Sequence, residues 1–332
     1  MEKVDIKRLA RELNLSISTV SRALRDSHEI SDSTKKKVFE LARQLNYQPN
    51  PHASSLREQR TKTIALIIPE VANNFFSLVI DGIESIAAEK GFHVLIYLTH
   101  EKTEKEVEFV RQLSNGRVDG ILMSVSGLGQ SITHLEDLMQ KNIPLVFFDR
   151  TPDELDVPKI ITDDRDSSFR ATEHLIQCGC KKIVHVSILR QMSISDKRKQ
   201  GYLDAINKHG LPEMVLDCSI DEEETYQLIK TCIREQKPDA LFASLERLAI
   251  AAYYVCGELG LNIPGDLKVL SFSNLQTASL LNPPLTTVTQ SAFDMGAAAT
   301  KQLFRLIKGQ EIDERTITIR ADLIRRKSTS CD

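Results

Sequence analysis

From residue 63 onward, short runs of apolar and often β-branched residues alternate with longer amphipathic stretches. Such runs are typical of buried strands, and the stretches between them repeat apolar residues at helical spacing. Strands are expected at 64–69, 93–99, 120–125 and 144–149, and in a second series at 182–189, 215–220, 240–245 and 268–273. Repeated βαβ units form parallel sheets that helices cover on both faces. The pattern therefore predicts an α/β body, 63–332, with two similar lobes.

Two later segments, 286–291 and 315–324, are expected to be strands that return the chain toward the first lobe. Lobe 1 would then comprise about 63–161 plus 291–318, and lobe 2 about 162–290 plus 319–330. Several crossings between two lobes make a hinged clamshell, whose cleft at the strand ends is the default ligand site.

Residues 1–48 predict a separate head of three short helices. Asp5, Ser16 and Ser31 are candidate N-caps. The apolar residues of the helices fall largely at i, i+3, i+4 and i+7: Ile6, Leu9, Ala10 and Leu13, then Val20, Ala23 and Leu24, then Val38, Leu41, Ala42 and Leu45. Two helices joined by about three residues and braced by a third match a helix-turn-helix.

The solvent face of the second predicted helix has the chemistry of a DNA-reading surface: Ile17, Ser18, Thr19, Ser21, Arg22 and Arg25. Small hydroxyl residues allow close approach to the major groove, and an arginine can donate two hydrogen bonds to a guanine. Residues 1–62 carry 13 Lys and Arg against 8 Asp and Glu, although the whole chain has a net charge of −3. The alternative is a three-helix cap that docks on protein and leaves a solvated polar face.

A connector follows at 49–62, and it contains a large apolar residue that a simple spacer does not need, Leu56. Pro49 ends the third helix, and Asn50-Pro51 is an N-cap and first-turn pair. The new helix could reach only Arg57 or Glu58, and a helix this short is marginal in water without a partner. Leu56 either packs on the body or contacts the partner that stabilises this short helix.

The stretches IKRLARELNLSISTVSRALRD (6–26) and ISDSTKKKVFELARQLNYQPNPHASSLR (30–57) resemble the head and hinge of the lactose repressor/galactose repressor (LacI/GalR) family. They include a V-S-R-x-L motif at 20–24 and a Y-x-P-N-x-x-A-x-x-L motif at 47–56. In the body, VDG (118–120), GDLKVLSFSN (265–274) and NPPLTTVTQSAFDMG (282–296) are also similar to family motifs. The resemblance implies a periplasmic-binding-protein-like body and hinge helices that pair on DNA.

With this resemblance, the chain is expected to be an allosteric transcription regulator, most simply a repressor, that binds a near-palindromic operator as a homodimer. The leucine of the hinge would wedge into the minor groove and kink the duplex. The expected DNA-binding residues are Ile17, Ser18, Thr19, Ser21, Arg22, His28, Asn50, Leu56 and Arg57. Without a terminal leucine heptad before Cys331-Asp332, tetramers are not expected.

The expected effector-binding residues are Phe75, Phe76, Asp149, Arg190, Arg198, Glu246 and Asn274. The two phenylalanines match aromatic ligand-stacking positions of the family, or simply pack at a helix start. Leu245-Glu246 stands where relatives commonly show Asn-Asp, and Ser273-Asn274 where many have Asp. A sugar or sugar derivative is the first expectation; a nucleobase, another metabolite or a phosphorylated protein co-regulator stays open.

Other function classes find little support in the sequence. A phosphate loop, a nucleophile elbow and an H-E-x-x-H motif are all missing, so an enzyme is not expected. Asp163, Asp164 and Asp166 are interpreted as a solvated lobe junction rather than a metal or catalytic site. The six cysteines are interpreted as thiols, and no cofactor or metal is expected. A receptor without a gene target would predict a signal peptide and no basic head, whereas the N-terminus is charged and no apolar run could span a membrane, so the cytoplasm is expected.

Overall fold

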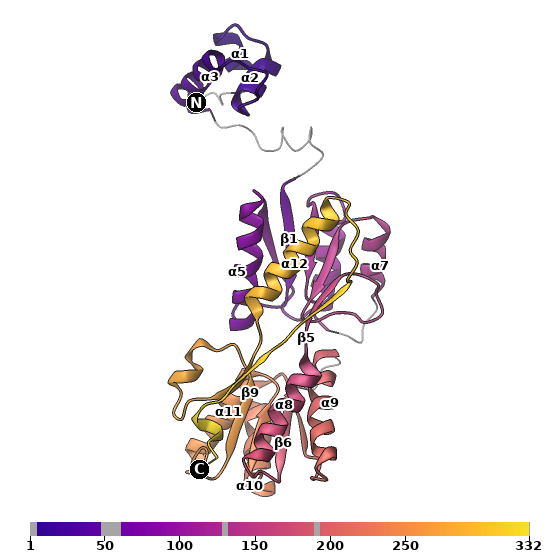
Figure 1. Cartoon of the computed structure of the whole chain (residues 1–332), viewed down its shortest axis with the longest axis vertical. Helices are drawn as coiled ribbons and strands as arrows, with labels where there is room; N and C mark the ends of the chain where they lie inside the picture. The colour runs from indigo at the N-terminus through magenta and orange to yellow at the C-terminus, as the bar shows by residue number, and fades with distance from the viewer. Residues whose placement is uncertain (1–4, 48–60, 128–131, 189–192, 332) are drawn as a thin grey trace. The chain divides into compact units, whose positions relative to one another are not determined.

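The computed structural model describes residues 5–47, 61–127, 132–188 and 193–331 (Figure 1). It divides into two compact units, 1–61 and 62–332. The first unit contains α1 (Ile6–Glu12), α2 (Ile17–Leu24) and α3 (Asp32–Gln44). Each of the three predicted N-caps is confirmed, because the side chains of Asp5, Ser16 and Ser31 accept hydrogen bonds from backbone N–H groups three residues later.

A small apolar core holds the three helices of the head together. Its fully or nearly fully buried members come from all three helices: Leu9, Ala10, Val20, Ala23, Val38 and Ala42. Leu24, Leu41 and Leu45 are half-buried around this core. The predicted helical faces are therefore confirmed, and the polar side of α2 is left facing solvent.

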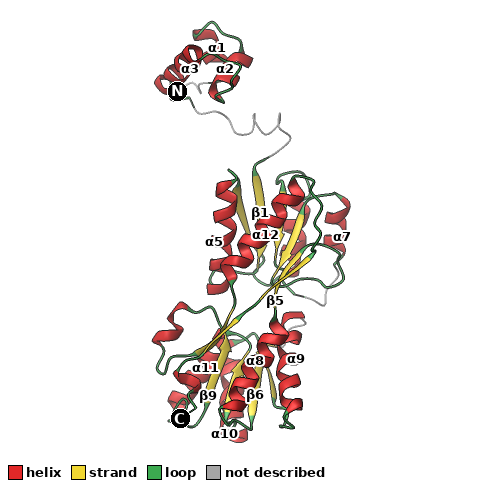
Figure 2. Ribbon diagram, viewed as in Figure 1, coloured by secondary structure: helices red, strands yellow, loops and turns green. Residues whose placement is uncertain are grey.

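The second unit contains two six-stranded sheets with helices on both faces (Figure 2). The first sheet has the order β11-β5-β4-β3-β1-β2, and its strands are β1 (Thr63–Ile68), β2 (His93–Leu98), β3 (Gly120–Met123), β4 (Leu145–Phe148), β5 (Lys159–Thr162) and β11 (Thr316–Ile319). The second has the order β12-β10-β9-β8-β6-β7, and its strands are β6 (Ile183–Ile188), β7 (Val215–Cys218), β8 (Ala240–Ala243), β9 (Lys268–Phe272), β10 (Thr286–Thr289) and β12 (Asp322–Ile324). We refer to the parts built on these two sheets as lobe 1 and lobe 2.

Helices cover both faces of each sheet, which explains the continuous apolar runs of the central strands. In lobe 1, one core lies under α5 (Asn74–Glu89) and α12 (Ala292–Ile307), and the other under α6 (Thr103–Leu113) and α7 (Thr133–Gln140). In lobe 2, the two cores lie under α8 (Asp164–Gln177) with α9 (Ser193–Lys208), and under α10 (Glu222–Gln236) with α11 (Glu246–Leu259). The α/β fold class is confirmed.

Two glycines allow α5 and α12 to pack with their backbones in contact. A Cβ atom on Gly82 would lie 2.1 Å from the carbonyl oxygen of Phe293, and one on Gly296 would lie 2.2 Å from that of Val79. Any side chain at these positions would push the helices apart. The approach matters because α12 follows β10 of lobe 2 and carries the chain back to lobe 1.

Within the described residues the chain crosses between the lobes three times: after β5, after β10, and between β11 and β12. Two details differ from the sequence expectation. Strand β5 was not predicted, because it is only four residues long and directly follows a proline. Its residues alternate between half-exposed and buried. The segment 315–324 is not one strand, since it divides between the two sheets, and β12 pairs antiparallel with β10. Within the part of the chain that the structure describes, no helix is long and apolar enough to cross a membrane.

Candidate functional site

The outer face of α2 presents the predicted DNA-binding residues. Ile17 is 47% exposed although it is a large apolar residue, and Ser18 and Arg22 are also exposed. Thr19 and Ser21 are half-exposed. The Ser16 hydroxyl, which caps the helix, lies 2.7 Å from the Ser18 hydroxyl and 2.8 Å from that of Thr19. The start of α2 is thus a cluster of hydroxyl groups in a fixed arrangement.

Arg22 is held in this structure by an ion pair. Its Nη1 lies 2.8 Å from Oε2 of Glu29, and both side chains are about half exposed. Exposed pairs of this kind contribute little stability. Glu29 therefore orients the guanidinium without preventing its transfer to another acceptor. One turn later, Arg25 donates a hydrogen bond to the Ser21 hydroxyl at 3.1 Å.

Of the remaining predicted DNA contacts, one lies within the described residues and three do not. His28 is exposed in the segment between α2 and α3. Asn50, Leu56 and Arg57 lie outside the described residues, so the hinge prediction stays a prediction.

The second candidate site lies between the lobes and centres on Arg198 of α9, which is only 3% exposed. Its guanidinium donates hydrogen bonds to three acceptors: Asp164 Oδ1 at 2.7 Å, the Ser244 carbonyl at 2.7 Å and Gln290 Oε1 at 3.2 Å. The guanidinium carbon also lies 3.8 Å from the ring centre of Phe272, a cation–π arrangement. The cation is thus satisfied on every side by groups of the protein.

The hydrogen bonds continue from Arg198 to two of the interlobe crossings. Gln290, which follows β10, donates to the Thr162 hydroxyl at 2.8 Å, and Thr162 ends β5. Asn274 donates to the Gln290 carbonyl at 2.7 Å. A change in the position of Arg198 would therefore affect two of the three segments that cross between the lobes. We call this set, Asp164, Arg198, Gln290, Thr162 and Asn274, the junction network.

Glu246 joins the two lobes directly. Its Oε1 accepts a hydrogen bond from Asn74 of lobe 1 at 3.0 Å, and its Oε2 accepts one from Ser273 of lobe 2 at 2.8 Å. Glu246 is the first residue of α11, and Asn74 is the first residue of α5. The Glu246 side chain thus spans the gap between the two lobes with one hydrogen bond on each side.

Burial changes the ionisation of the carboxyl groups at this junction. It raises the pKa of Asp164 to about 6, because loss of hydration outweighs the opposing effect of Arg198. It also raises the pKa of Asp149, again mainly through desolvation, with Arg150 and Arg198 acting in the opposite sense. Arg150 forms a two-point ion pair with Glu101 at 2.8 and 2.9 Å. The junction is thus rich in carboxyl groups and guanidinium groups that already have partners.

The structure places most predicted effector residues around this junction. Arg198 and Asn274 belong to the junction network, Glu246 bridges the lobes, and Asp149 interacts electrostatically with Arg198. Arg190 lies outside the described residues.

Phe75 and Phe76 pack edge to face with ring centres 5.2 Å apart, inside the core beneath α5. Phe76 is 2% exposed. Its position favours the packing alternative over stacking on a ligand.

One sequence interpretation is wrong at Asp164 and holds only in part at Asp163, whose side chain is 12% exposed. The acidic cluster was expected to be a solvated junction, and Asp166 is indeed exposed. Asp164, however, is 4% exposed and pairs with Arg198. Asp163 accepts hydrogen bonds from Ala321 N at 2.7 Å and from Arg170 at 3.0 Å.

Sequence reasoning missed several polar residues of the junction: Asn74, Thr162, Ser273 and Gln290. Asn74 begins α5, and the other three lie at or just after the ends of β5, β9 and β10. For Ser273 and Gln290 the available signal was a polar residue at the end of a predicted strand, where a cleft forms.

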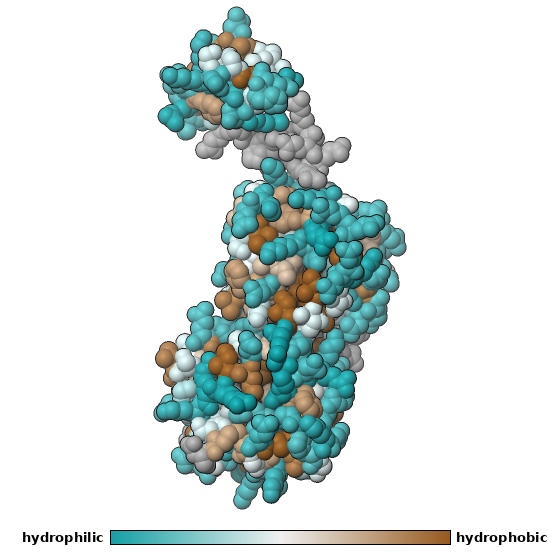
Figure 3. All heavy atoms as spheres, in the orientation of Figure 1, coloured by the Kyte–Doolittle hydropathy of each residue, from teal (hydrophilic) through white to brown (hydrophobic). Residues whose placement is uncertain are grey.

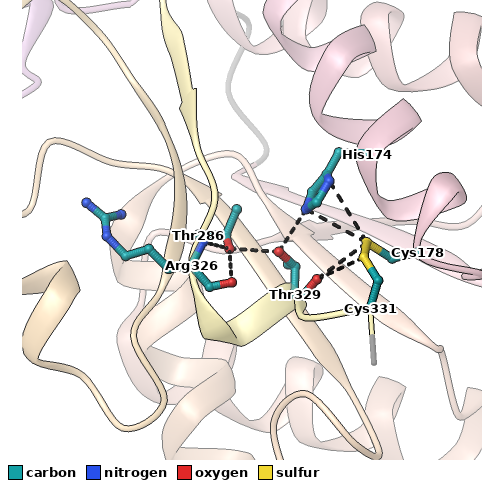
Figure 4. Close-up of a disulfide and its surroundings, with 6 residues drawn as sticks. All are labelled: His174, Cys178, Thr286, Arg326, Thr329 and Cys331. Atoms are coloured by element: carbon teal, nitrogen blue, oxygen red, sulfur yellow. Dashed lines mark hydrogen bonds between the residues drawn. A yellow bond between two sulfur atoms is a disulfide. The ribbon is translucent and has the colours of Figure 1, made fainter.

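The cysteine interpretation is wrong for one pair. Cys178 and Cys331 form a disulfide (Figure 4). Cys180, Cys218, Cys232 and Cys256 are buried thiols. Among the described residues, no group of three or more His, Cys, Asp or Glu side chains is arranged to hold a metal ion.

Comparison with known proteins identifies a family for each of the two units. Residues 5–50 match the family described as bacterial regulatory proteins, lacI family, and residues 61–327 match periplasmic binding proteins and the sugar binding domain of the LacI family. The HTH-type transcriptional regulator RegA of Clostridium saccharobutylicum is 31% identical, with 98% of each chain covered. Catabolite control protein A of Priestia megaterium is 29% identical, with 98% of this chain and 99% of the relative covered.

A crystal structure of the Lac repressor dimer bound to operator and the anti-inducer ONPF has the same fold. It superposes with a TM-score of 0.89 at 22% identity and covers 99% of each chain. The family match spans most of this chain, from the helix-turn-helix to the end of the body. The chain therefore belongs to the LacI family of bacterial regulatory proteins, and it is a DNA-binding transcription regulator.

Proposed function

We propose that this protein is a homodimeric repressor whose binding to a near-palindromic operator is controlled by a small-molecule effector between the lobes. The observation that carries the DNA part of the proposal is the exposed face of α2. That face combines a fixed hydroxyl cluster, an exposed isoleucine and an arginine that forms a solvent-exposed ion pair with Glu29. A protein that works on chromosomal DNA would act in the cytoplasm.

In this proposal α2 enters the major groove. Ile17 and Ser18 contact base edges, Arg22 donates two hydrogen bonds to a guanine, and Thr19 and Ser21 contact phosphates. His28 and the hinge residues Asn50, Leu56 and Arg57 complete the contacts along the operator. The hinge leucines of two subunits would wedge at the centre of the site, where unstacking costs energy that the extra contacts of bent DNA offset.

Exposed apolar residues support the proposed dimer. On the face of the body seen in Figure 3, hydrophobic side chains reach the surface in both lobes. Leu95 and Ile96 lie exposed on β2, which is an edge strand of its sheet. Tyr254 on α11 is 70% exposed, and Leu280 in η1 (Gln276–Leu280) is 78% exposed. Apolar patches on both lobes suit a partner that lies along the body, and a symmetric partner suits a palindromic site.

The junction network supports an effector site that controls the relation between the lobes. A ligand that contacts Asp149, Arg198, Glu246 or Asn274 must exchange bonds with residues that hold the crossings. Such a ligand favours one lobe arrangement only by its differential affinity for the two states. Carboxylate and amide acceptors beside an arginine are groups that bind hydroxyls, so a sugar or sugar derivative is the proposed class. The names of the relatives are those of regulators, which supports binding rather than catalysis.

The proposal is tested with the full chain and a fluorescent duplex from the region upstream of its own gene. We expect sequence-selective binding, with a Kd that rises steeply with salt as phosphate contacts are screened. A scrambled duplex of equal length and composition is the control. Equal affinity for the two duplexes at every salt concentration would contradict the proposal.

The effector class is tested separately by thermal shift, with sugars, sugar phosphates and nucleobases as the panel. A ligand of the folded state raises Tm in proportion to the logarithm of its concentration above Kd. We expect a sugar or sugar derivative to raise Tm and to change operator affinity in the duplex assay. A nucleobase that does both would overturn the sugar assignment and leave the repressor proposal standing.

A further inference from the structure

The disulfide joins two parts of lobe 2 that are distant in sequence. Cys178 directly follows α8, and Cys331 follows η2 (Lys327–Thr329), 153 residues later. Their Cα atoms are 4.8 Å apart, within the range that a disulfide spans. Figure 4 shows Cys178, His174 and Thr329 gathered around the bond.

Contacts that involve no sulfur already hold the two cysteines side by side. The Ser328 hydroxyl donates to the Val269 carbonyl at 2.6 Å, and the Thr329 hydroxyl lies 2.8 Å from Nε2 of His174. The Thr329 hydroxyl also lies 2.7 Å from that of Thr286 on β10. Ser328 and Thr329 are both buried. These bonds fix η2 against α8, so the two sulfur atoms would also face one another as thiols.

The pair differs from the other cysteines in its access to reagents. Cys331 is exposed and Cys178 is half-buried, whereas the four remaining cysteines are buried. Burial raises the pKa of Cys180 and Cys256 to about 11 and that of Cys218 to about 12. Because the thiolate is the reactive form, these buried thiols are poor competitors.

We propose that Cys178 and Cys331 form a reversible redox site, oxidised by a peroxide and restored by a dithiol reductant. The exposed Cys331 thiolate attacks one oxygen of hydrogen peroxide and the O–O bond breaks. Cys331 becomes a sulfenic acid, and the other oxygen takes up a proton and leaves as water. The Cys178 sulfur then attacks the Cys331 sulfur, forms the disulfide and releases a second water. Overall, two thiols and one peroxide give one disulfide and two waters.

His174 is placed to take the proton from Cys178 in the second step. Its Nδ1 lies 3.9 Å from the Cys178 sulfur, while its Nε2 faces the Thr329 hydroxyl. Burial, with a smaller effect of Arg325, lowers the pKa of His174, so its ring is neutral and can accept a proton. The Cys178 sulfur also lies 3.4 Å from the Thr329 carbonyl oxygen, which can accept a hydrogen bond from the thiol once the disulfide is reduced.

Reversibility rests on the proposed function, because a regulator beside chromosomal DNA works in a reducing compartment. Disulfides in such compartments are mostly transient and redox-sensing rather than structural. The failure of either idea can be told apart, since operator binding is measured on the duplex and oxidation is measured on the thiols.

Oxidation would tie the third interlobe crossing more firmly to lobe 2. Ala321 lies where the chain passes from β11 to β12, and residues of α8 and its start hold it: Asp163 accepts from its N–H at 2.7 Å, and Arg170 donates to its carbonyl at 2.9 Å. The disulfide adds a covalent link at the other end of α8. We therefore expect slower amide exchange across residues 321–331 in the oxidised protein.

The test uses the full-length protein reduced with dithiothreitol, then treated with hydrogen peroxide and digested without reductant. We expect a linked Cys178–Cys331 peptide, four free thiols instead of six, and full return to six on reduction. Oxidation should raise Tm by roughly 5 °C or more, because closing a loop this long restricts the unfolded chain.

Two variants control this experiment. In Cys331→Ser the linked peptide and the rise in Tm should both vanish, although the variant keeps the exposed position polar. In Cys180→Ala, two residues from Cys178, both should remain. Six free thiols after peroxide, a link through Cys180, or sulfinic acid at Cys331 without a link would each overturn the proposal.

Discussion

The outer face of α2 and the junction network between the lobes are both polar sites, yet they hold their polar groups in opposite ways. On the outer face of α2 the side chains are exposed or half-exposed, and Arg22 forms a solvent-exposed ion pair with Glu29. In the junction network, Arg198 is almost fully buried and has three hydrogen-bond acceptors and an aromatic ring around it. The outer face of α2 therefore leaves its polar groups open to solvent, whereas the polar groups of the junction network are already bound by other groups of the protein.

The difference indicates how each site can act. Removing a side chain from α2 costs the folded protein little, so such changes should appear mainly in DNA binding. Removing a member of the junction network leaves a buried group without its partner, which costs far more than an exposed pair is worth. In the proposed mechanism, a ligand at the junction would therefore substitute for existing bonds, and this exchange would couple ligand binding to the crossings.

The largest expected effect is that of Arg198→Met, which keeps an apolar side chain over Phe272 but removes the charge that faces Asp164. We expect the free energy of unfolding at pH 8 to fall by about 3–5 kcal/mol, as when one member of a buried ion pair is removed. Urea unfolding of both proteins measures this difference. Loss of the cation also raises the pKa of Asp164 further above its value of about 6.

The pH dependence follows from that shift. A folded-state pKa above the unfolded value contributes stability at low pH, and this stability is lost as pH rises through the folded pKa. In the native protein this contribution of Asp164 to stability is fully lost somewhat above pH 6, whereas in Arg198→Met the loss continues to higher pH. The difference between the two proteins should therefore be smaller at pH 5 than at pH 8. Arg165→Met, which removes an exposed ion pair with Asp204, is the control and should show no such trend.

Arg22→Ala should give the next effect, and only in the DNA complex. If Arg22 reads a guanine, specific affinity falls by about 1–3 kcal/mol and discrimination against a substituted base pair is lost at one position of each half-site. Tm should not change, because the pair with Glu29 is exposed. Fluorescence anisotropy on the operator and on singly substituted duplexes measures both quantities.

Arg25→Ala is the matched control on the same helix. We expect Arg25 to contact phosphate rather than a base, so its loss should weaken all duplexes alike and reduce the salt slope by about one. If Arg22→Ala behaves in this way too, Arg22 contacts the backbone rather than a base.

The head and most of the strands could be predicted from the sequence, whereas the contacts of the junction network could not. The periodic apolar residues of the head and the strand runs of the body are local signals, so the helices of the head and most strands could be predicted from neighbouring residues. The junction network joins residues as far apart as Thr162 and Gln290, and no local pattern pairs them. Asp164 shows the limit most clearly, because a carboxylate between two others reads as solvated until the fold places Arg198 against it.

Asn74→Ala should separate the lobes without greatly weakening either one. It removes the donor that Glu246 accepts from across the junction, and we expect a loss of about 1–2 kcal/mol in the free energy of unfolding. The radius of gyration from small-angle X-ray scattering should rise, and amides at the starts of α5 and α11 should exchange faster.

Its neighbour provides the control, because Asn73 caps α5 by accepting a hydrogen bond from Phe75 N at 2.9 Å and does not reach lobe 2 through that bond. Asn73→Ala should cost a similar amount of stability with no change in the radius of gyration. Equal scattering from the two variants would show that the Glu246 bond does not hold the lobes together.

The smallest expected effect comes from Ser16→Ala at the start of α2. The substitution removes the hydroxyl that accepts from Thr19 N at 3.1 Å and that orients Ser18 and Thr19. Loss of an N-cap costs about 1 kcal/mol, and the small core of the head offers few other contacts to offset this loss of stability. We expect the amides of α2 to exchange faster because the head is less stable, and operator affinity to fall modestly because α2 must reorder on binding.

Ser31→Ala removes the equivalent cap of α3, away from the proposed DNA face, so it should lower head stability to a similar degree. If the two variants lose equal affinity for the operator, the hydroxyl cluster of α2 acts only through stability and not through its position in the groove.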